Sequence, residues 1–192
     1  MSETPPITAF LDASVLYPAL LRNILMRLAL HGLFRARWSE RVHEEWIDAL
    51  LRNRPDLNRV QVEHTRRLMD THIQDALVEG YEYHIESLAL PDADDRHVLA
   101  AAIHCGANVI VTANLRDFPD SVLTDFGIEA LHPDKFILGL LDDDQNKVIA
   151  ALHQLREAHK NPPNTVADLL TTMKRQGLTA SANALSAFAD AL

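Results

Sequence analysis

The run NVIVT at residues 108–112 is rich in β-branched residues and does not alternate between apolar and polar positions. This pattern is typical of a parallel strand that is buried on both faces of its sheet. A second short apolar run, ITAFL at residues 7–11, ends at Asp12 and predicts another buried strand. Together the two runs predict an α/β fold with a central parallel sheet.

The residues around these runs carry helix signals. Apolar residues at helical spacing predict helices at residues 19–33, 39–54, 58–77 and 133–141, and an alanine-rich run predicts one that ends at Gly106. Weaker strand signals lie at residues 81–85 and 128–131. Because the strands are separated by helices, the order implies a parallel sheet covered by helices.

The chain changes character near residue 142. Helices are expected at residues 145–159, 165–176 and 180–192. The sequence NPPN at residues 161–164 interrupts them, because two consecutive prolines do not continue a helix. We therefore divide the chain into a first domain, residues 1–141, and a C-terminal helical extension, residues 142–192, whose apolar faces must pack against this domain, a second copy or a partner.

Composition narrows the class of protein. The chain has 192 residues, of which 47% are hydrophobic, and this allows one full core. Its single cysteine, Cys105, excludes an internal disulfide, and no apolar run reaches membrane-spanning length. We expect a cytoplasmic protein that does not contact a membrane.

Charge is distributed unevenly along the chain, which carries a formal net charge of -9. Residues 22–67 hold ten arginines against six acidic residues, a net +4, whereas residues 75–144 hold fifteen acidic residues against three basic ones, a net -12. A basic flank beside an acidic region suits a site that binds phosphates with one part and cations with the other. Ordinary solvated helix faces explain the same pattern.

Acidic residues gather in the sequence PDADDRHVLAAA, residues 91–102. One aspartate is explained as a helix cap, but a third in four positions adds repulsion that capping does not offset. Ligands of open parallel sheets bind outside the carboxyl ends of the strands. Asp12, Asp95 and Asp117 are expected there, and Glu45 comes from the second predicted helix.

A cluster of carboxylates without cysteines or a histidine pair favours a hard cation such as Mg²⁺ or Mn²⁺. Two such ions can stabilise the attacking and leaving oxygens of a phosphodiester. The chemistry that these residues predict is metal-dependent phosphoryl hydrolysis.

Four stretches carry a resemblance to a known family: FLDASVLY, WSERVHEEW, PDADDRHVLAAA and VIVTANLRDFP. They resemble the successive acidic motifs of PIN-domain ribonucleases, in particular VapC-type toxins of bacterial toxin-antitoxin pairs, over residues 7–136. The resemblance implies a PIN-like, Rossmann-like three-layer α/β/α sandwich. It also implies Mg²⁺ or Mn²⁺ as cofactor, RNA as substrate, a cognate antitoxin as partner, and a homodimer.

The resemblance assigns the family's four acids to Asp12, Glu45, Asp95 and Asp117. Glu45 is preferred to Glu44 because the family's glutamate falls six residues after the helix-capping serine. Asn114 stands where some relatives have aspartate. We expect Asp94 to be the helix cap, while Asp92 is a further candidate ligand.

Smaller polar and basic residues surround the four acids. Ser14, Thr112 and Asn114 are expected to orient the carboxylates, although each also suits a turn. Arg96 and Arg116 are candidate RNA contacts or members of structural ion pairs. His43, His97 and His104 are interpreted as ordinary packed or surface histidines. The competing function is a non-catalytic PIN-like module that binds RNA or protein.

Overall fold

The structure is a computed structural model that describes residues 6–158 and 164–192. The expected helix break at residues 161–163 lies outside the described residues. Five strands form the sheet: β1 (Thr8–Leu11), β2 (Arg35–Ser39), β3 (Leu77–Val78), β4 (Val109–Val111) and β5 (Glu129–Leu131).

All strand pairs of the sheet are parallel, and the strand order is β3-β2-β1-β4-β5. The chain extends the sheet from β1 toward β3 on one side and through β4 to β5 on the other. The switch point therefore lies between β1 and β4, where ligands of open α/β sheets bind. In the register, Leu11 pairs with Val111, so Asp12 and Thr112 leave the sheet side by side.

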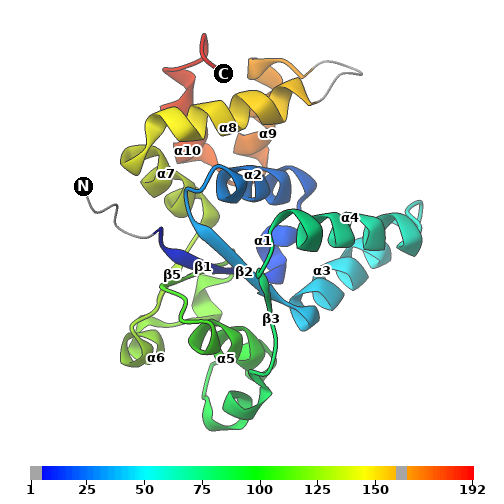
Figure 1. Cartoon of the computed structure of the whole chain (residues 1–192), viewed down its shortest axis with the longest axis vertical. Helices are drawn as coiled ribbons and strands as arrows, with labels where there is room; N and C mark the ends of the chain where they lie inside the picture. Colours follow the sequence, from blue (N-terminus) through cyan, green and yellow to red (C-terminus); the bar gives the residue numbers. More distant parts are fainter. Residues whose placement is uncertain (1–5, 159–163) are drawn as a thin grey trace.

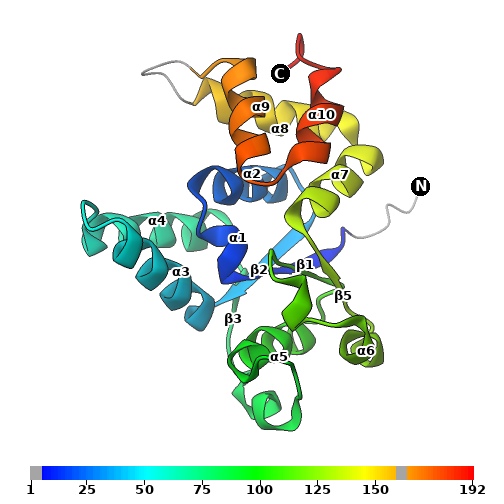
Figure 2. The same cartoon turned by 180° about the vertical axis from the view of Figure 1, so that it is seen from behind.

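Helices cover the sheet on both faces. The α-helices are α1 (Ala13–Leu16), α2 (Ala19–Leu30), α3 (Glu40–Asn53), α4 (Arg59–His72), α5 (Arg96–His104), α6 (Asp120–Leu123), α7 (Pro133–Asp143), α8 (Gln145–Glu157), α9 (Val166–Arg175) and α10 (Thr179–Ser186). Short 3-10 helices are η1 (Glu82–Ser87), η2 (Ala93–Asp95), η3 (Leu115–Asp117) and η4 (Thr124–Phe126). In Figures 1 and 2, α5 and α6 lie on one side of the sheet and α2 and α7 on the other. The predicted α/β/α sandwich with C-terminal helices is confirmed.

Strand β2 was not predicted from the sequence, and β3 lies at other residues than those predicted. Strand β2 has the sequence RARWS, in which Ala36 and Trp38 are buried while Arg35 is exposed. The strand signal at residues 81–85 was wrong, because this segment forms η1. The third strand is instead β3, which pairs Trp38 with Leu77 and begins inside the range predicted as helix.

A buried polar network ties α3 to β2 and α4. The Asp70 carboxylate accepts hydrogen bonds from Trp38 Nε1 at 2.8 Å and from His43 Nε2 at 3.1 Å. His43 Nδ1 accepts from Trp46 Nε1 at 3.0 Å, so its neutral tautomer carries the proton on Nε2. Burial lowers the pKa of His43 and favours this neutral form. The network fixes the helix that carries Glu45.

The C-terminal helices pack on the first domain. In Figure 2, α10 lies beside α7 and α9 beside α2. Apolar residues of α9 and α10, including Leu169, Met173 and Leu185, belong to the same buried cluster as the sheet residues. The division at residue 142 stays a prediction.

Two polar contacts anchor these helices. The Asp134 carboxylate accepts from the backbone amides of Ala180 and Ser181 at 2.9 and 2.8 Å and from the Ser181 hydroxyl at 2.6 Å. Gln176 Oε1 accepts from the amide of Leu21 at 3.2 Å. That amide belongs to the first turn of α2, whose N-cap, Pro18, makes no side-chain cap.

Over the described ranges, none of the helices combines the length and the apolar character that crossing a membrane requires.

Candidate acidic site at the sheet switch point

Asp12 is the most tightly held of the predicted acids. It directly follows β1 and is only 5% exposed. Its Oδ1 accepts from the amide of Ala13 at 2.7 Å, and its Oδ2 accepts from Ser14 Oγ at 2.6 Å and Thr112 Oγ1 at 2.8 Å. Asn114 contributes only its amide, which donates to Thr112 Oγ1 at 3.0 Å. Hydrogen bonds to both oxygens offset the cost of burying the Asp12 carboxylate.

The other acids lie around Asp95, which is half-buried at the end of η2. Burial, the largest cause, and the charges of Asp12, Asp117, Asp92 and Glu45 together raise the pKa of Asp95 to about 7. The acids therefore share one electrostatic site although they come from four separate segments. Asp95 makes no side-chain cap at the start of α5, so its carboxylate is not used in holding the helix.

The helix cap in this turn is Asp92 rather than Asp94. Asp92 Oδ1 accepts from the amide of Asp94 at 2.9 Å, and this bond begins η2. The expectation that Asp94 is the cap was wrong, because the helix starts one short 3-10 turn earlier than the alanine-rich run indicates. Capping does not exclude Asp92 from the site, since Asp92 contributes to the field at Asp95.

Glu45 is the member contributed by α3. Its Oε1 lies 2.8 Å from His97 Nε2 and 3.4 Å from Arg41 Nε. The neighbouring Glu44 is exposed and makes no such contact among the described residues. Arg41 was not among the predicted site residues, and His97 was predicted to be an ordinary packed or surface histidine. The spacing of Arg41 and Glu45, four residues apart on one helix, was an available signal.

Asp117 comes from the loop that follows β4. It ends η3, is half-buried, and lines a cavity of about 570 Å³ together with Ala113, Asn114, Leu115 and Arg116. The exposed Arg116 side chain thus lies beside the acids. Arg96 Nε donates to the carbonyl of Ala93 at 2.9 Å, and its terminal nitrogens have no hydrogen-bond partner in the described part of the chain.

The donor set fits a hard divalent cation, because it consists of carboxylates whose mutual repulsion is unrelieved at Asp95. The carboxylates are not drawn together into a finished coordination shell. Among residues 6–158 and 164–192, no group of three His, Cys, Asp or Glu side chains lies close enough to hold a metal ion. Charges interact over longer distances than ligand bonds span, so these acids influence Asp95 without lying within bonding distance of one ion. Binding would therefore require side-chain rotation at the half-buried acids Glu45, Asp95 and Asp117.

The arginine-rich flank is largely occupied by internal contacts. Arg22 is 7% exposed, donates to the carbonyl of Leu16 at 2.7 Å, and stacks over Trp46. Burial lowers the pKa of Arg22 to about 10. Arg54 pairs with Asp56 at 2.6 Å, and Arg66 pairs with Glu40. Arg22 is therefore enclosed in the fold, whereas Arg54 and Arg66 hold ion pairs at the surface. Arg27, Arg52 and Arg67 make no ion pair with a described residue.

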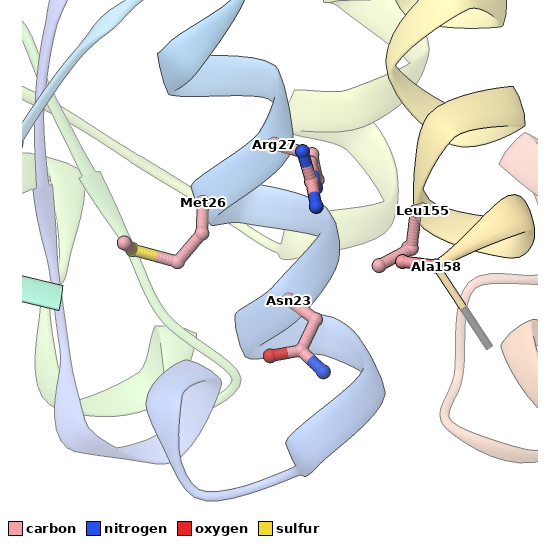
Figure 3. A pocket seen from close by; sticks show the side chains of 5 residues that line it. All are labelled: Asn23, Met26, Arg27, Leu155 and Ala158. Atoms are coloured by element: carbon pink, nitrogen blue, oxygen red, sulfur yellow. The ribbon is translucent and has the colours of Figure 1, made fainter. Parts of the chain in front are cut away.

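A separate pocket of about 280 Å³ lies away from the acids, between α2 and α8. Figure 3 shows Asn23 and Arg27 of α2 opposite Leu155 of α8 and Ala158, the C-cap of that helix, while Met26 extends from the other side of α2. No acidic residue lines it among the described residues. The pocket follows from the packing of α8 on α2 and does not belong to the acidic site.

A parallel sheet with carboxylates gathered at its switch point matches a known family. Residues 8–116 match the family model of the PIN domain, and the chain belongs to this family. Residues 133–187 match a second model, the VapC50 C-terminal domain. A curated protein of Mycobacterium tuberculosis, named "Putative ribonuclease VapC50", is 45% identical over 82 residues. The alignment covers 43% of this chain and 48% of that protein, so the chain spans about half the length of this relative. No solved structure matches the chain.

Proposed function

We propose that this chain is a metal-dependent endoribonuclease that hydrolyses RNA phosphodiester bonds at the acidic site. The observation that carries the proposal is the electrostatic coupling of Asp95 to four other carboxylates at the switch point of the sheet. Membership of the PIN domain family and a relative whose name includes ribonuclease support it. Mg²⁺ or Mn²⁺, when bound, supplies Lewis-acid stabilisation of the negative charge on a phosphodiester.

The residues of the chain have separate roles in this proposal. Asp12, Glu45, Asp95 and Asp117 are the cation ligands, and Asp92 is a fifth candidate. Ser14 and Thr112 hold the Asp12 carboxylate in one orientation through hydrogen bonds of 2.6 and 2.8 Å. Asn114 supports this arrangement only through its backbone amide.

Two arginines beside the acids are proposed to bind RNA. Arg116 lines the cavity that also contains Asp117, and Arg96 follows Asp95 directly. A guanidinium group binds a phosphate through two parallel hydrogen bonds, which would bring the scissile phosphate next to the carboxylates. The cavity of about 570 Å³ is large enough for a nucleotide-sized group.

We infer that the biological role is that of the toxin of a toxin-antitoxin pair, with a cognate antitoxin as partner. The match of residues 133–187 to the VapC50 C-terminal domain supports this inference, because it extends the likeness beyond the PIN domain. A homodimer and a role of the C-terminal helices in partner contact belong to the same proposal. A reading frame for a small DNA-binding protein beside the gene would support the pairing, and its absence would count against it.

The test is degradation of a labelled RNA by the purified chain with Mg²⁺, with Mn²⁺ and with EDTA. We expect cleavage that EDTA abolishes, and loss of cleavage in Asp12→Asn and Asp95→Asn. Asp94→Asn is the matched control, because Asp94 lies in the same turn but is exposed and is not among the main charges that raise the pKa of Asp95. A protein that binds the metal but leaves RNA intact would instead be a non-catalytic RNA- or protein-binding module.

A further inference from the structure

His97 is a buried histidine, and Glu45 is the one described residue within ion-pair distance of it. It is the second residue of α5 and is 1% exposed. Among the described residues, neither ring nitrogen has a well-aligned hydrogen-bond partner. Its Nε2 nevertheless lies 2.8 Å from Glu45 Oε1, a distance that a hydrogen bond would have. The contact is therefore close but not straight.

Glu45 is the partner with freedom to rotate. Its side chain is 37% exposed, whereas that of His97 is fully enclosed. Arg41 Nε approaches the same oxygen, Oε1, at 3.4 Å. The printed approach of each partner thus falls on Oε1, and among the described residues none donates a hydrogen bond to Oε2. An exposed glutamate without such contacts would sample several rotamers and lose that freedom on binding a ligand.

His97 also joins two parts of the acidic site. Asp95 lies two residues before it, at the start of α5, while Glu45 belongs to α3. A rigid imidazole between these helices sets where the Glu45 carboxylate stands relative to Asp95. We propose that His97 is a positioning residue, which holds Glu45 through Oε1 and leaves Oε2 directed to a divalent cation. The inference rests on the proposed metal site and adds to it a residue outside the ligand set.

The competing explanation is that His97 only fills space in the core. Under this explanation His97→Leu, which has a similar volume and no nitrogen atoms, would leave cation binding unchanged. It would also keep or raise the stability, because two buried nitrogens without aligned partners disappear. If His97 positions Glu45, the same variant folds normally but binds the cation more weakly.

The experiment is calorimetric titration of Mn²⁺ into the full chain, together with thermal unfolding in EDTA. Loss of a residue that orients a metal ligand typically weakens metal affinity about 10- to 100-fold, and we expect this for His97→Leu. His97→Gln, whose amide can donate to Glu45, should recover part of the affinity. His104→Gln is the matched control at the exposed end of the same helix and should bind Mn²⁺ like the wild type.

A double-mutant cycle separates positioning from a general effect on the fold. In a Glu45→Ala background, replacing His97 by Gln should cause no further loss of Mn²⁺ affinity, because the group it acts through is gone. Additive losses, or wild-type affinity in both His97 variants, would overturn the inference. If His97→Leu does not fold, the double-mutant cycle of His97→Gln and Glu45→Ala still tests whether His97 acts through Glu45. A wild-type chain that binds no Mn²⁺, or Asp12→Asn and Asp95→Asn variants with full affinity, would overturn the metal site itself.

Discussion

Replacing Asp95 by asparagine should stabilise the metal-free protein. In the wild type, burial and the neighbouring carboxylates raise the pKa of Asp95 from 3.8 to about 7, which means that the ionised form is disfavoured by folding. At about 1.4 kcal/mol per pKa unit, the shift sets an upper limit of about 4 kcal/mol. Because Asp95 is only half-buried, solvent screening reduces the expected gain to about 1–2 kcal/mol.

The effect has a defined pH dependence. Since the pKa of the folded state lies above that of the unfolded state, the cost of ionised Asp95 is fully present above pH 7. It fades as the pH falls toward 3.8, because the folded wild type then carries a neutral carboxyl. At pH 8 in EDTA, Asp95→Asn should raise the melting temperature by about 2–8 °C, and the gain should shrink steadily below pH 7.

The assay is thermal unfolding followed by circular dichroism between pH 5 and pH 8, with Asp94→Asn measured in parallel. Adding Mn²⁺ should stabilise the wild type and leave Asp95→Asn nearly unchanged, since binding to the folded state shifts unfolding by mass action. Equal melting temperatures of the Asp95 and Asp94 variants at pH 8 would refute the reasoning. So would a gain that is independent of pH.

Three further predictions follow from other contacts. Arg67→Ala should weaken RNA binding and lower by about 1 the slope of log affinity against log salt concentration. Arg54→Ala removes an arginine that is already paired with Asp56 and should change this slope less. Equal slopes in the two variants would place the RNA elsewhere. Asp70→Ala should lower the free energy of unfolding by about 2–4 kcal/mol in urea titrations, because buried donors of Trp38 and His43 lose their acceptor; an unchanged midpoint would contradict the network. Asp134→Ala should cost about 1–2 kcal/mol and speed hydrogen exchange in α10 more than in β4, and uniform acceleration would show that α10 is not separately anchored.

The sequence predicts the central strands better than the edge of the sheet. β1 and β4 are buried on both faces, so their residues are nearly all apolar and are recognisable in isolation. β2 alternates buried Ala36 and Trp38 with arginines, and this short, charged segment was not recognised as a strand from its sequence. The strand prediction for residues 81–85 was wrong for another reason. Tyr81 is buried as it would be in a strand, but the residues after it form the 3-10 helix η1. Local composition does not contain the tertiary packing that decides between these outcomes.

Asp12, Asp95 and Asp117 could be proposed from sequence because each follows a strand or begins a helix, whereas Glu45 lies inside α3 and was assigned through the family resemblance. Their surroundings could not. Asp12 is held by Ser14, which is near in sequence, and by Thr112, which is 100 residues away. The contact of His97 with Glu45 joins two helices whose relative placement no local pattern reveals. Catalytic candidates are thus visible from their chemistry, whereas the residues that orient them depend on the assembled fold.

The bond from Leu21 to Gln176 has a consequence for the timing of biosynthesis. The two residues are 155 positions apart, so the first turn of α2 obtains this hydrogen bond only after most of the chain has been made. At about 5–20 residues per second, that interval is about 8–30 s on the ribosome. During this time the amide of Leu21 donates to water, and the first turn of α2 gains the Gln176 acceptor only when α9 has been made. The last helices to emerge therefore complete one of the first to form.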